Sequence, residues 1–317
     1  MSQPESPRPF RFGVNLMTSA PADEWRAKCR RAEELGYDVI LVPDHLGMPA
    51  PFPALVAAAE ATQRPRLGTF VLNAGFWNPA LLAREVATTD ALTGGRLELG
   101  LGTGYVKAEH DTAGLPWLSP GGRVDHLRRT IEEVYRLLAS EELPHSRIRS
   151  SGGTPMPQPV QRPRVPLLVG GNGDRVLGLT AEHADIAAFT GARSVRGDST
   201  GKLEVLLAGE LEERVARYRE LAAAAGRKEP EPTELNLLIQ FVLDTDDREA
   251  AVQPLLERVP NLTPDQVLEL PIGLIGTVEE MTAQVLAQRE RYGFTYLTVL
   301  EPNMEAFAPV MARLRGK

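Results

Sequence analysis

"GTFVLNAGFWNPALLAREVATTDALTGGRLELGLGTGY" occupies residues 68–105 and contains a complete strand, helix and strand in succession. An apolar run over 66–76, which begins just before this stretch, predicts the strand that precedes the helix. Pro79 suits the first turn of that helix, which ends at the glycines of "TGGR", residues 93–96. A second apolar run follows at 97–104. Two buried strands joined by a helix form a parallel pair, because a parallel connection needs a crossover of about a dozen residues or more.

The same alternation of apolar runs and helical patterns extends along the whole chain. Further strands are expected at 10–17, 38–43, 167–171, 185–190, 234–243 and 295–301. Helices are expected at 22–35, 52–62, 120–140, 173–182 and 203–225, with two short helices before 272–277, one helix from a Thr277/Glu280 capping box to 292, and a last one to 314. Eight apolar strands, each followed by a helical crossover, predict an α/β fold, a (β/α)8 TIM barrel with extra residues in its loops.

We expect a single barrel domain over 1–317, because the proline-rich segment 154–166 is short and leads directly into another strand. The net charge of −7, with basic residues scattered along the chain, argues against nucleic acid or an anionic membrane as a partner and favours a small-molecule substrate. No stretch of about 18 apolar residues predicts a membrane span, and the N-terminus lacks an export signal. The single cysteine, Cys29, is consistent with a cytoplasmic location.

Polar residues gather where the predicted strands end. They are Asn15, Asp44, His45, Asn73, Trp77, Thr103 to Tyr105, Gly170 to Gly173 and Glu301. Because active sites of such barrels lie at the carboxyl ends of the strands, we expect these residues to converge at one mouth. Asp44 and His45 have a plainer interpretation as a helix cap and a rim residue, which stays open.

Two glycine-rich turns differ in the ligand that they favour. "GLGTGY", residues 100–105, is not a dinucleotide fingerprint, because no helix begins at Tyr105. "VGGNGDRV", residues 169–176, takes a strand into a helix and offers backbone N–H groups to a phosphate, although a tight turn without a ligand also fits. The five histidines lie in five separate segments, so no metal site is expected.

Four stretches of the chain resemble the luciferase-like monooxygenase superfamily, particularly its branch of reductases and dehydrogenases that use the deazaflavin coenzyme F420. They are "FRFGVNL" at 10–16, "VPDH" at 42–45, the segment 68–105, and "PVQRPRVPLLVGGNG" at 159–173. The resemblance covers nearly the whole chain and is most specific over 68–105. It implies a barrel enzyme, commonly a homodimer, that holds a flavin or deazaflavin across the carboxyl ends of its strands.

The resemblance also assigns expected roles to individual residues. Asp44 and His45 fall beside the cofactor ring, and Phe70–Val71 falls where the family has a non-prolyl cis peptide behind the ring. Thr103 and Gly104 match contacts to the ring edge, and Gly170, Gly171 and Asn172 match the phosphate turn. In one departure, Tyr105 stands where the sugar-phosphate dehydrogenases carry an acidic glutamate. This substitution argues against sugar-phosphate oxidation, because a phenol with a pKa near 10 is mainly a hydrogen-bond donor.

The leading hypothesis is F420-dependent hydride transfer to or from an enone, imine, ketone or alcohol. His45 would be the acid/base, since its pKa lies near neutrality, and Tyr105 would donate a hydrogen bond or wall the pocket. Asn15, Trp77 and His110 are candidate substrate contacts, as is Trp117. The loops 105–120 and 191–202 are candidate lids. Arg164, Arg175, Arg193 and Arg196 are candidate partners of the anionic F420 tail.

Two alternatives remain open at this level. One is an FMN-dependent monooxygenase that uses O2 and reduced flavin from a separate cofactor-reducing enzyme. The other is a non-catalytic flavin-binding barrel. The adjacent Asp44 and His45 favour F420 over FMN, whereas the two intact glycine turns argue against the non-catalytic barrel.

Overall fold

A closed ring of parallel strands forms the centre of the computed structural model, which describes residues 8–139, 157–195, 198, 202–226 and 233–317. The barrel strands are β1 Arg11–Asn15, β2 Val39–Val42, β3 Arg66–Thr69, β5 Leu97–Gly102, β6 Leu167–Gly170, β7 Ile186–Phe189, β10 Glu234–Ile239 and β13 Tyr296–Leu300. Each pairs in parallel with its neighbours, and the pairing of β3 with β5 closes the ring. The prediction of a (β/α)8 barrel is confirmed.

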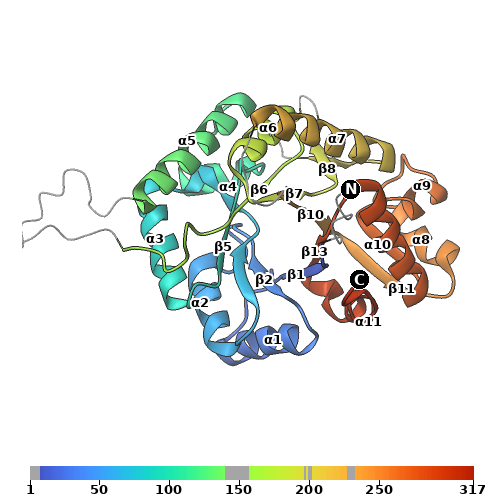
Figure 1. Cartoon of the computed structure of the whole chain (residues 1–317). Coiled ribbons are helices and arrows are strands. Elements are labelled where there is room, and N and C mark those ends of the chain that lie inside the picture. The colour runs from blue at the N-terminus through green and yellow to red at the C-terminus, as the bar shows by residue number, and fades with distance from the viewer. Residues whose placement is uncertain (1–7, 140–156, 196–197, 199–201, 227–232) are drawn as a thin grey trace, which may run out of the picture.

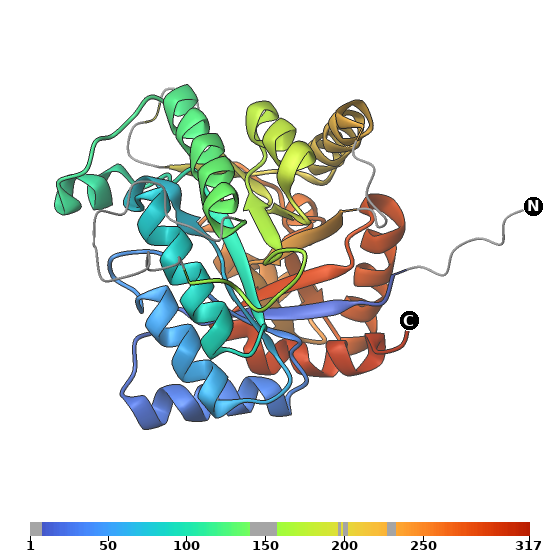
Figure 2. The same ribbon diagram turned by 60° about the vertical axis from the view of Figure 1, so that its left-hand side comes forward.

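Helices surround the strands on all sides (Figure 1). They are α1 Ala22–Glu34, α2 Pro51–Ala61, α3 Pro79–Leu92, α4 Lys107–Ala113, α5 Pro120–Leu138, α6 Asp174–His183, α7 Ala208–Ala225, α8 Arg248–Leu256, α9 Pro264–Leu268, α10 Val278–Tyr292 and α11 Met304–Leu314. Figure 2 shows the outer row of helices from the side. The predicted capping box of Thr277 and Glu280 begins α10. None of the described helices is long and apolar enough to cross a bilayer.

Most strand residues are apolar because both faces of the barrel strands are buried. Along β2, Val39 and Leu41 belong to a cluster inside the barrel, whereas Ile40 and Val42 belong to the larger core under the helices. The alternation follows from the two-residue period of a strand. The inner cluster also contains Phe70, Leu168, Ile186, Ala188, Leu238 and Tyr296.

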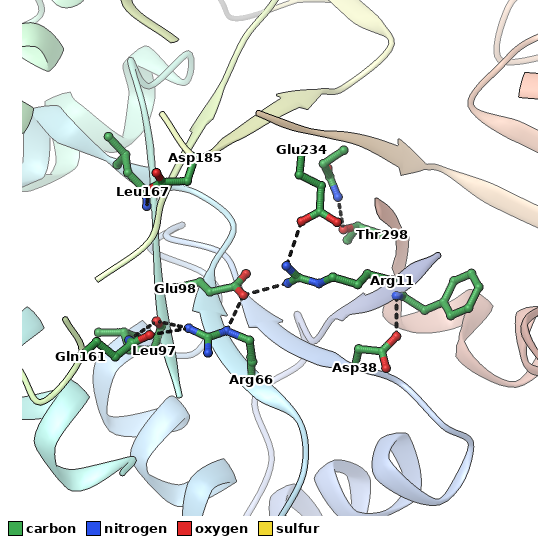
Figure 3. Close-up of polar contacts among 12 residues, drawn as sticks. Arg11, Asp38, Arg66, Leu97, Glu98, Gln161, Leu167, Asp185, Glu234 and Thr298 are labelled. Carbon is green, nitrogen blue, oxygen red and sulfur yellow. Dashed lines mark hydrogen bonds and ion pairs between the residues drawn. The ribbon is translucent and has the colours of Figure 1, made fainter. Parts of the chain in front are cut away.

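Charged side chains close the amino end of the barrel (Figure 3). Arg11 bonds Glu98 at 2.7 Å and Glu234 at 2.8 Å, and Arg66 approaches the same Glu98 oxygen at 2.6 Å. The guanidinium of Arg11 also lies over the ring of Tyr296, 4.5 Å from its centroid. Glu98 and Glu234 are only 2% and 5% exposed, so these ion pairs fill the barrel floor.

The predicted strand over 66–76 is shorter than expected. β3 ends at Thr69, a cis peptide joins Phe70 and Val71, and the chain resumes as β4, Leu72–Asn73, and a single turn, η1, Ala74–Phe76. The side chain of Asn73 accepts a hydrogen bond from Gly75 N and so turns the chain out of the sheet. The cis peptide that the family resemblance implied is present.

Two other elements differ from prediction. The run 234–243 divides at Gln240, beyond which β11, Phe241–Asp244, leaves the barrel to pair with β12, Gly273–Gly276. The helix predicted over 203–225 begins only at Ala208, because Leu203–Val205 forms strand β9. This strand pairs antiparallel with β8, Ala192–Ser194, and a cross-strand ion pair between Arg193 and Glu204 supports it.

Candidate active site

A cavity of about 880 Å³ opens at the carboxyl ends of the barrel strands. Most residues that the sequence placed at this mouth line it together. They are Asn15, Asp44, His45, Phe70, Val71, Asn73, Thr103, Gly104, Tyr105, Gly170, Gly171, Asn172 and Gly173. Its size lies within the usual range for cofactor and ligand sites.

His45 lies between a carboxylate and a phenol. Its Nδ1 is 3.0 Å and 3.1 Å from the two carboxylate oxygens of Glu109, and its Nε2 is 3.5 Å from the hydroxyl of Tyr105. The backbone N–H of Leu46 also donates to Glu109, at 3.2 Å. Three types of group that can move or stabilise a proton therefore meet at the cavity wall.

Sequence reasoning missed Glu109, because the segment 105–120 was expected to be a loop. The structure instead contains α4 there, with Glu109 in its first turn, one helical turn beyond Tyr105. No local pattern in the sequence indicates the contact between Glu109 and His45, because it depends on how α4 packs against the loop after β2. His45, the common neighbour of Tyr105 and Glu109, lies about 60 residues earlier in the chain.

Asp44 contacts the adjacent loop through hydrogen bonds. One of its oxygens accepts from the backbone N–H of Asn73 at 3.1 Å and from the indole N–H of Trp77 at 2.9 Å. Burial raises the pKa of this carboxyl group above its usual value, and the two hydrogen bonds oppose that rise. Asp44 lines the cavity and also secures the segment that follows the cis peptide.

Trp77 and His110 lie behind the cavity wall and do not line it, which corrects their prediction as substrate contacts. Trp77 donates to Asp44 and packs edge-on against Phe52. His110 is 2% exposed because it is held between the Asn73 amide and the Pro116 carbonyl, each 3.0 Å away. Packing inside the wall therefore explains both residues.

Two more predicted positions have structural partners. Trp117 packs edge-on against His110, with the guanidinium of Arg123 4.1 Å from a ring centroid of Trp117. Glu301 accepts hydrogen bonds from the backbone N–H groups of Met17 and Thr18, at 2.7 Å and 2.8 Å. Glu301 therefore fixes the loop that follows β1.

The glycine turn after β6 is shaped by close contacts. Gly171 has φ of +141°, a conformation that side chains rarely adopt, and a Cβ there would lie 2.9 Å from Val176. Asn172 next to it is 9% exposed and donates through its amide to the carbonyl of Ala192 and to Thr190. Its Oδ1 is buried without a hydrogen-bond partner, and α6 begins two residues later.

The arginines predicted near the mouth have different locations. Arg193 lines the cavity and pairs with Glu204 and Glu210, whereas Arg175 does not line it and pairs with Asp125. Arg164 precedes β6 and bonds Asp185, which precedes β7, so it lies at the opposite end of the barrel and that prediction was wrong.

Arg196 lies outside the described residues, as do 197 and 199–201 of the candidate lid over 191–202. Two arginines that the sequence did not single out, Arg123 and Arg214, line the cavity. Arg214 is paired with Asp174 at 2.6 Å. The arginines that line the described part of the cavity thus follow β5 and β7.

A model of the luciferase-like monooxygenase family matches residues 8–269, and the chain belongs to this family. Over 124 residues it is 38% identical to the F420-dependent glucose-6-phosphate dehydrogenase of Intrasporangium calvum, which covers 36% of this chain and 37% of that enzyme. The chain thus matches little more than a third of this relative's length.

Solved structures share the fold over almost the entire chain. An F420-dependent secondary alcohol dehydrogenase, in complex with an F420–acetone adduct, aligns with a TM-score of 0.74 at 19% identity, over 97% of this chain and 100% of that one. The oxygenating constituent of 3,6-diketocamphane monooxygenase from Pseudomonas putida, in complex with FMN, aligns with a TM-score of 0.71 at 17% identity, over 97% and 96% of the chains. The family prediction is confirmed.

Proposed function

We propose that the protein is an F420-dependent oxidoreductase that transfers a hydride between the deazaflavin and a small organic substrate. The observation that carries the proposal is the placement of His45, with Glu109 and Tyr105, in the same cavity as the Phe70–Val71 peptide and the glycine turn. The local identity to an F420-dependent dehydrogenase supports the same cofactor.

The residues of the cavity fit a ring with a phosphate-bearing tail. Val71 packs closely over β5, where a Cβ on Gly102 would lie 2.7 Å from the Val71 side chain, so the strand needs glycine beneath this wall. The turn at Gly171 and Asn172 leads into the start of α6, where no side chain caps the helix and the first backbone N–H groups can donate to a phosphate. We assign the ring to the Val71 side and the phosphate to this turn.

The chemistry divides between the cofactor and the chain. F420, when bound, supplies a carbon that accepts or donates the hydride. His45 donates or accepts the accompanying proton, because a substrate oxygen gains a proton when a carbonyl is reduced and loses one when an alcohol is oxidised. Tyr105 is a hydrogen-bond donor, since burial and then the charge of Glu109 raise the pKa of its hydroxyl.

The charges around the cavity favour a substrate without a phosphate or carboxylate at its reacting end. From β10 through β13 and β1 to β2, the described lining carries no lysine or arginine. It consists of Leu238, Gln240, Leu300, Asn15, Met17, Pro43, Asp44, His45 and Met48. An anion about 4 Å from the Glu109 carboxylate would be disfavoured by about 4 kcal/mol at an effective dielectric constant of 20.

FMN-dependent oxygenation is the second candidate, because a barrel of this shape binds FMN in the diketocamphane monooxygenase. The monooxygenase would need a separate enzyme to supply reduced FMN. The hydride-transfer enzyme would need one to supply reduced F420 when it reduces its substrate. The two differ in oxygen: the monooxygenase consumes O2, whereas the hydride-transfer enzyme works equally well without it.

The test is anaerobic turnover of F420, or its reduced form, with a panel of uncharged ketones and secondary alcohols beside sugar phosphates. We expect turnover with the uncharged compounds, and a drop of about 10²-fold or more in kcat for His45→Ala with F420 affinity retained. His183→Ala is the matched control, because His183 lies on α6 against Glu182 and Glu132. Full turnover by His45→Ala would overturn the assignment of His45, and O2 consumption with reduced FMN would favour the alternative.

A further inference from the structure

We infer that Glu109 is the positioning residue of this site, which fixes the tautomer and charge of His45 so that Nε2 exchanges the substrate proton. For its kinetic consequences the inference rests on the proposed function. The effect of the Glu109 carboxylate on the protonation of His45 does not depend on any cofactor.

Glu109 is held in place from both sides. Its two oxygens lie 3.0 Å and 3.1 Å from His45 Nδ1, and the Leu46 N–H adds a third contact at 3.2 Å. The next residue, His110, anchors α4 because its buried ring bonds Asn73 and the Pro116 carbonyl. The His45 and Glu109 side chains are 25% and 17% exposed, so the pair is partly shielded from water.

The pairing decides which nitrogen of His45 carries the proton. A carboxylate only accepts hydrogen bonds, so Nδ1 must be the N–H, and the lone pair of the neutral ring is on Nε2. Nε2 faces the hydroxyl of Tyr105, which lines the cavity. This arrangement makes Nε2 the proton acceptor and, after protonation, the donor.

The proton and hydride then balance in either direction. When an alcohol is oxidised, its C–H bond breaks with the electron pair going to the oxidised deazaflavin, and its O–H proton passes to His45 Nε2. When a ketone is reduced, a hydride from the reduced deazaflavin reaches the carbonyl carbon and Nε2 returns the proton to the oxygen. The Nδ1 proton stays on His45 throughout, where it donates to the Glu109 carboxylate, and the negative charge of Glu109 stabilises the imidazolium.

Two carboxyl groups and one phenol lie around His45. Glu109 approaches from α4, the carboxyl of Asp44 precedes it in the chain, and Tyr105 follows β5 as a neutral hydroxyl. Replacement of Glu109 by Gln keeps an oxygen that can accept from Nδ1 and removes the charge. The pKa of His45 should therefore fall in that variant while the ring keeps its place.

The experiment is an NMR titration of the His45 imidazole in the protein without cofactor, with the resonance assigned through His45→Gln. In Glu109→Gln we expect the pKa of His45 to fall, as for loss of an opposite charge in direct contact. Glu109→Asp, which restores the charge, should recover part of the shift. Asp111→Asn is the matched control on the same helix, where Asp111 pairs with Lys107.

The kinetic arm follows kcat/KM against pH with F420. The limb that reports His45 should move to lower pH in Glu109→Gln, in both reaction directions, by the same amount as the NMR shift. An unchanged pKa of His45 in both Glu109→Gln and Glu109→Ala, each checked for folding by its thermal melt, would overturn the inference. A shifted pKa without F420 turnover would leave the pairing standing and reject the proposed function.

Discussion

Asp44 and His45 are adjacent in the chain but have different partners. Asp44 accepts from the Asn73 backbone and the Trp77 indole, whereas His45 contacts Glu109 and Tyr105. The two residues therefore contact different parts of the cavity wall. One holds the loop that follows β4, and the other faces the proposed chemistry.

We predict that Asp44→Ala lowers the free energy of unfolding by about 1–3 kcal/mol, because two donors lose their shared acceptor. Asp44→Asn should be milder, since its amide oxygen can accept both bonds and its burial carries no charge. Urea denaturation at neutral pH measures both, with the exposed Asp111→Ala as control, for which a change within about 0.5 kcal/mol is expected. Equal stability of Asp44→Ala and the wild-type protein would contradict this assignment.

The sequence predicted the location of single residues better than the contacts between them. The strand ends placed His45 and Tyr105 at one mouth, because parallel strands present their carboxyl ends on the same side. The contact between His45 and Glu109 depends on where α4 packs, which no local pattern records. The same reason explains why Trp77 and His110 were assigned to the cavity rather than to the packing behind it.

Among the elements, β3 and β5 approach each other closely where they pair. Thr69 Oγ1 accepts from Gly100 N and donates to Gly100 O, each at 2.8 Å. A Cβ on Gly100 would lie 1.9 Å from the carbonyl oxygen of Thr69, so no side chain fits between the strands. The pairing of β3 with β5 closes the barrel directly below the cis peptide.

We expect Gly100→Ala to destabilise the protein by about 1–3 kcal/mol or more, because the backbone of one strand must shift. Gly47→Ala serves as the control, since nothing lies within 4 Å of a Cβ at that position. Thermal and urea unfolding of both variants provide the comparison. If the two alanines were equally tolerated, the close approach of β3 and β5 would be refuted.

The elements that the sequence predicted well are those governed by local periodicity. The barrel strands and α1 to α3 follow from apolar runs and helix ends such as Asn78, which caps α3 before Pro79. The hairpin of β8 and β9 and the departure of β11 from the barrel were missed, because pairing partners outside the barrel determine both.

For the whole molecule, the two ends of the barrel differ in character. The amino end is filled by the ion pairs of Arg11, Arg66, Glu98 and Glu234 (Figure 3), whereas the carboxyl end holds the cavity. Burial is the largest influence on Glu234 and raises its pKa, and the charge of Arg11 opposes the rise. The sequence did not predict this network, because its members come from four strands far apart in the chain.

The raised pKa of the Glu234 carboxyl group determines how its contribution to stability changes with pH. The folded protein binds a proton at Glu234 more tightly than the unfolded chain, so this residue's contribution to stability falls as pH rises above its ordinary pKa. We predict that the stability difference between wild type and Glu234→Gln declines from about pH 4 upward and levels off once the folded carboxyl is ionised. Urea denaturation of both proteins across this range tests it, and a difference that increases with pH would contradict the raised pKa.

Equilibrium binding decides whether the barrel is built to hold F420 for hydride transfer. Purified protein is titrated with F420 and with FMN, each oxidised and reduced, and followed by intrinsic tryptophan fluorescence. We predict tight binding of F420 and much weaker binding of FMN. Tight binding of FMN with weak binding of F420 would contradict the proposed function.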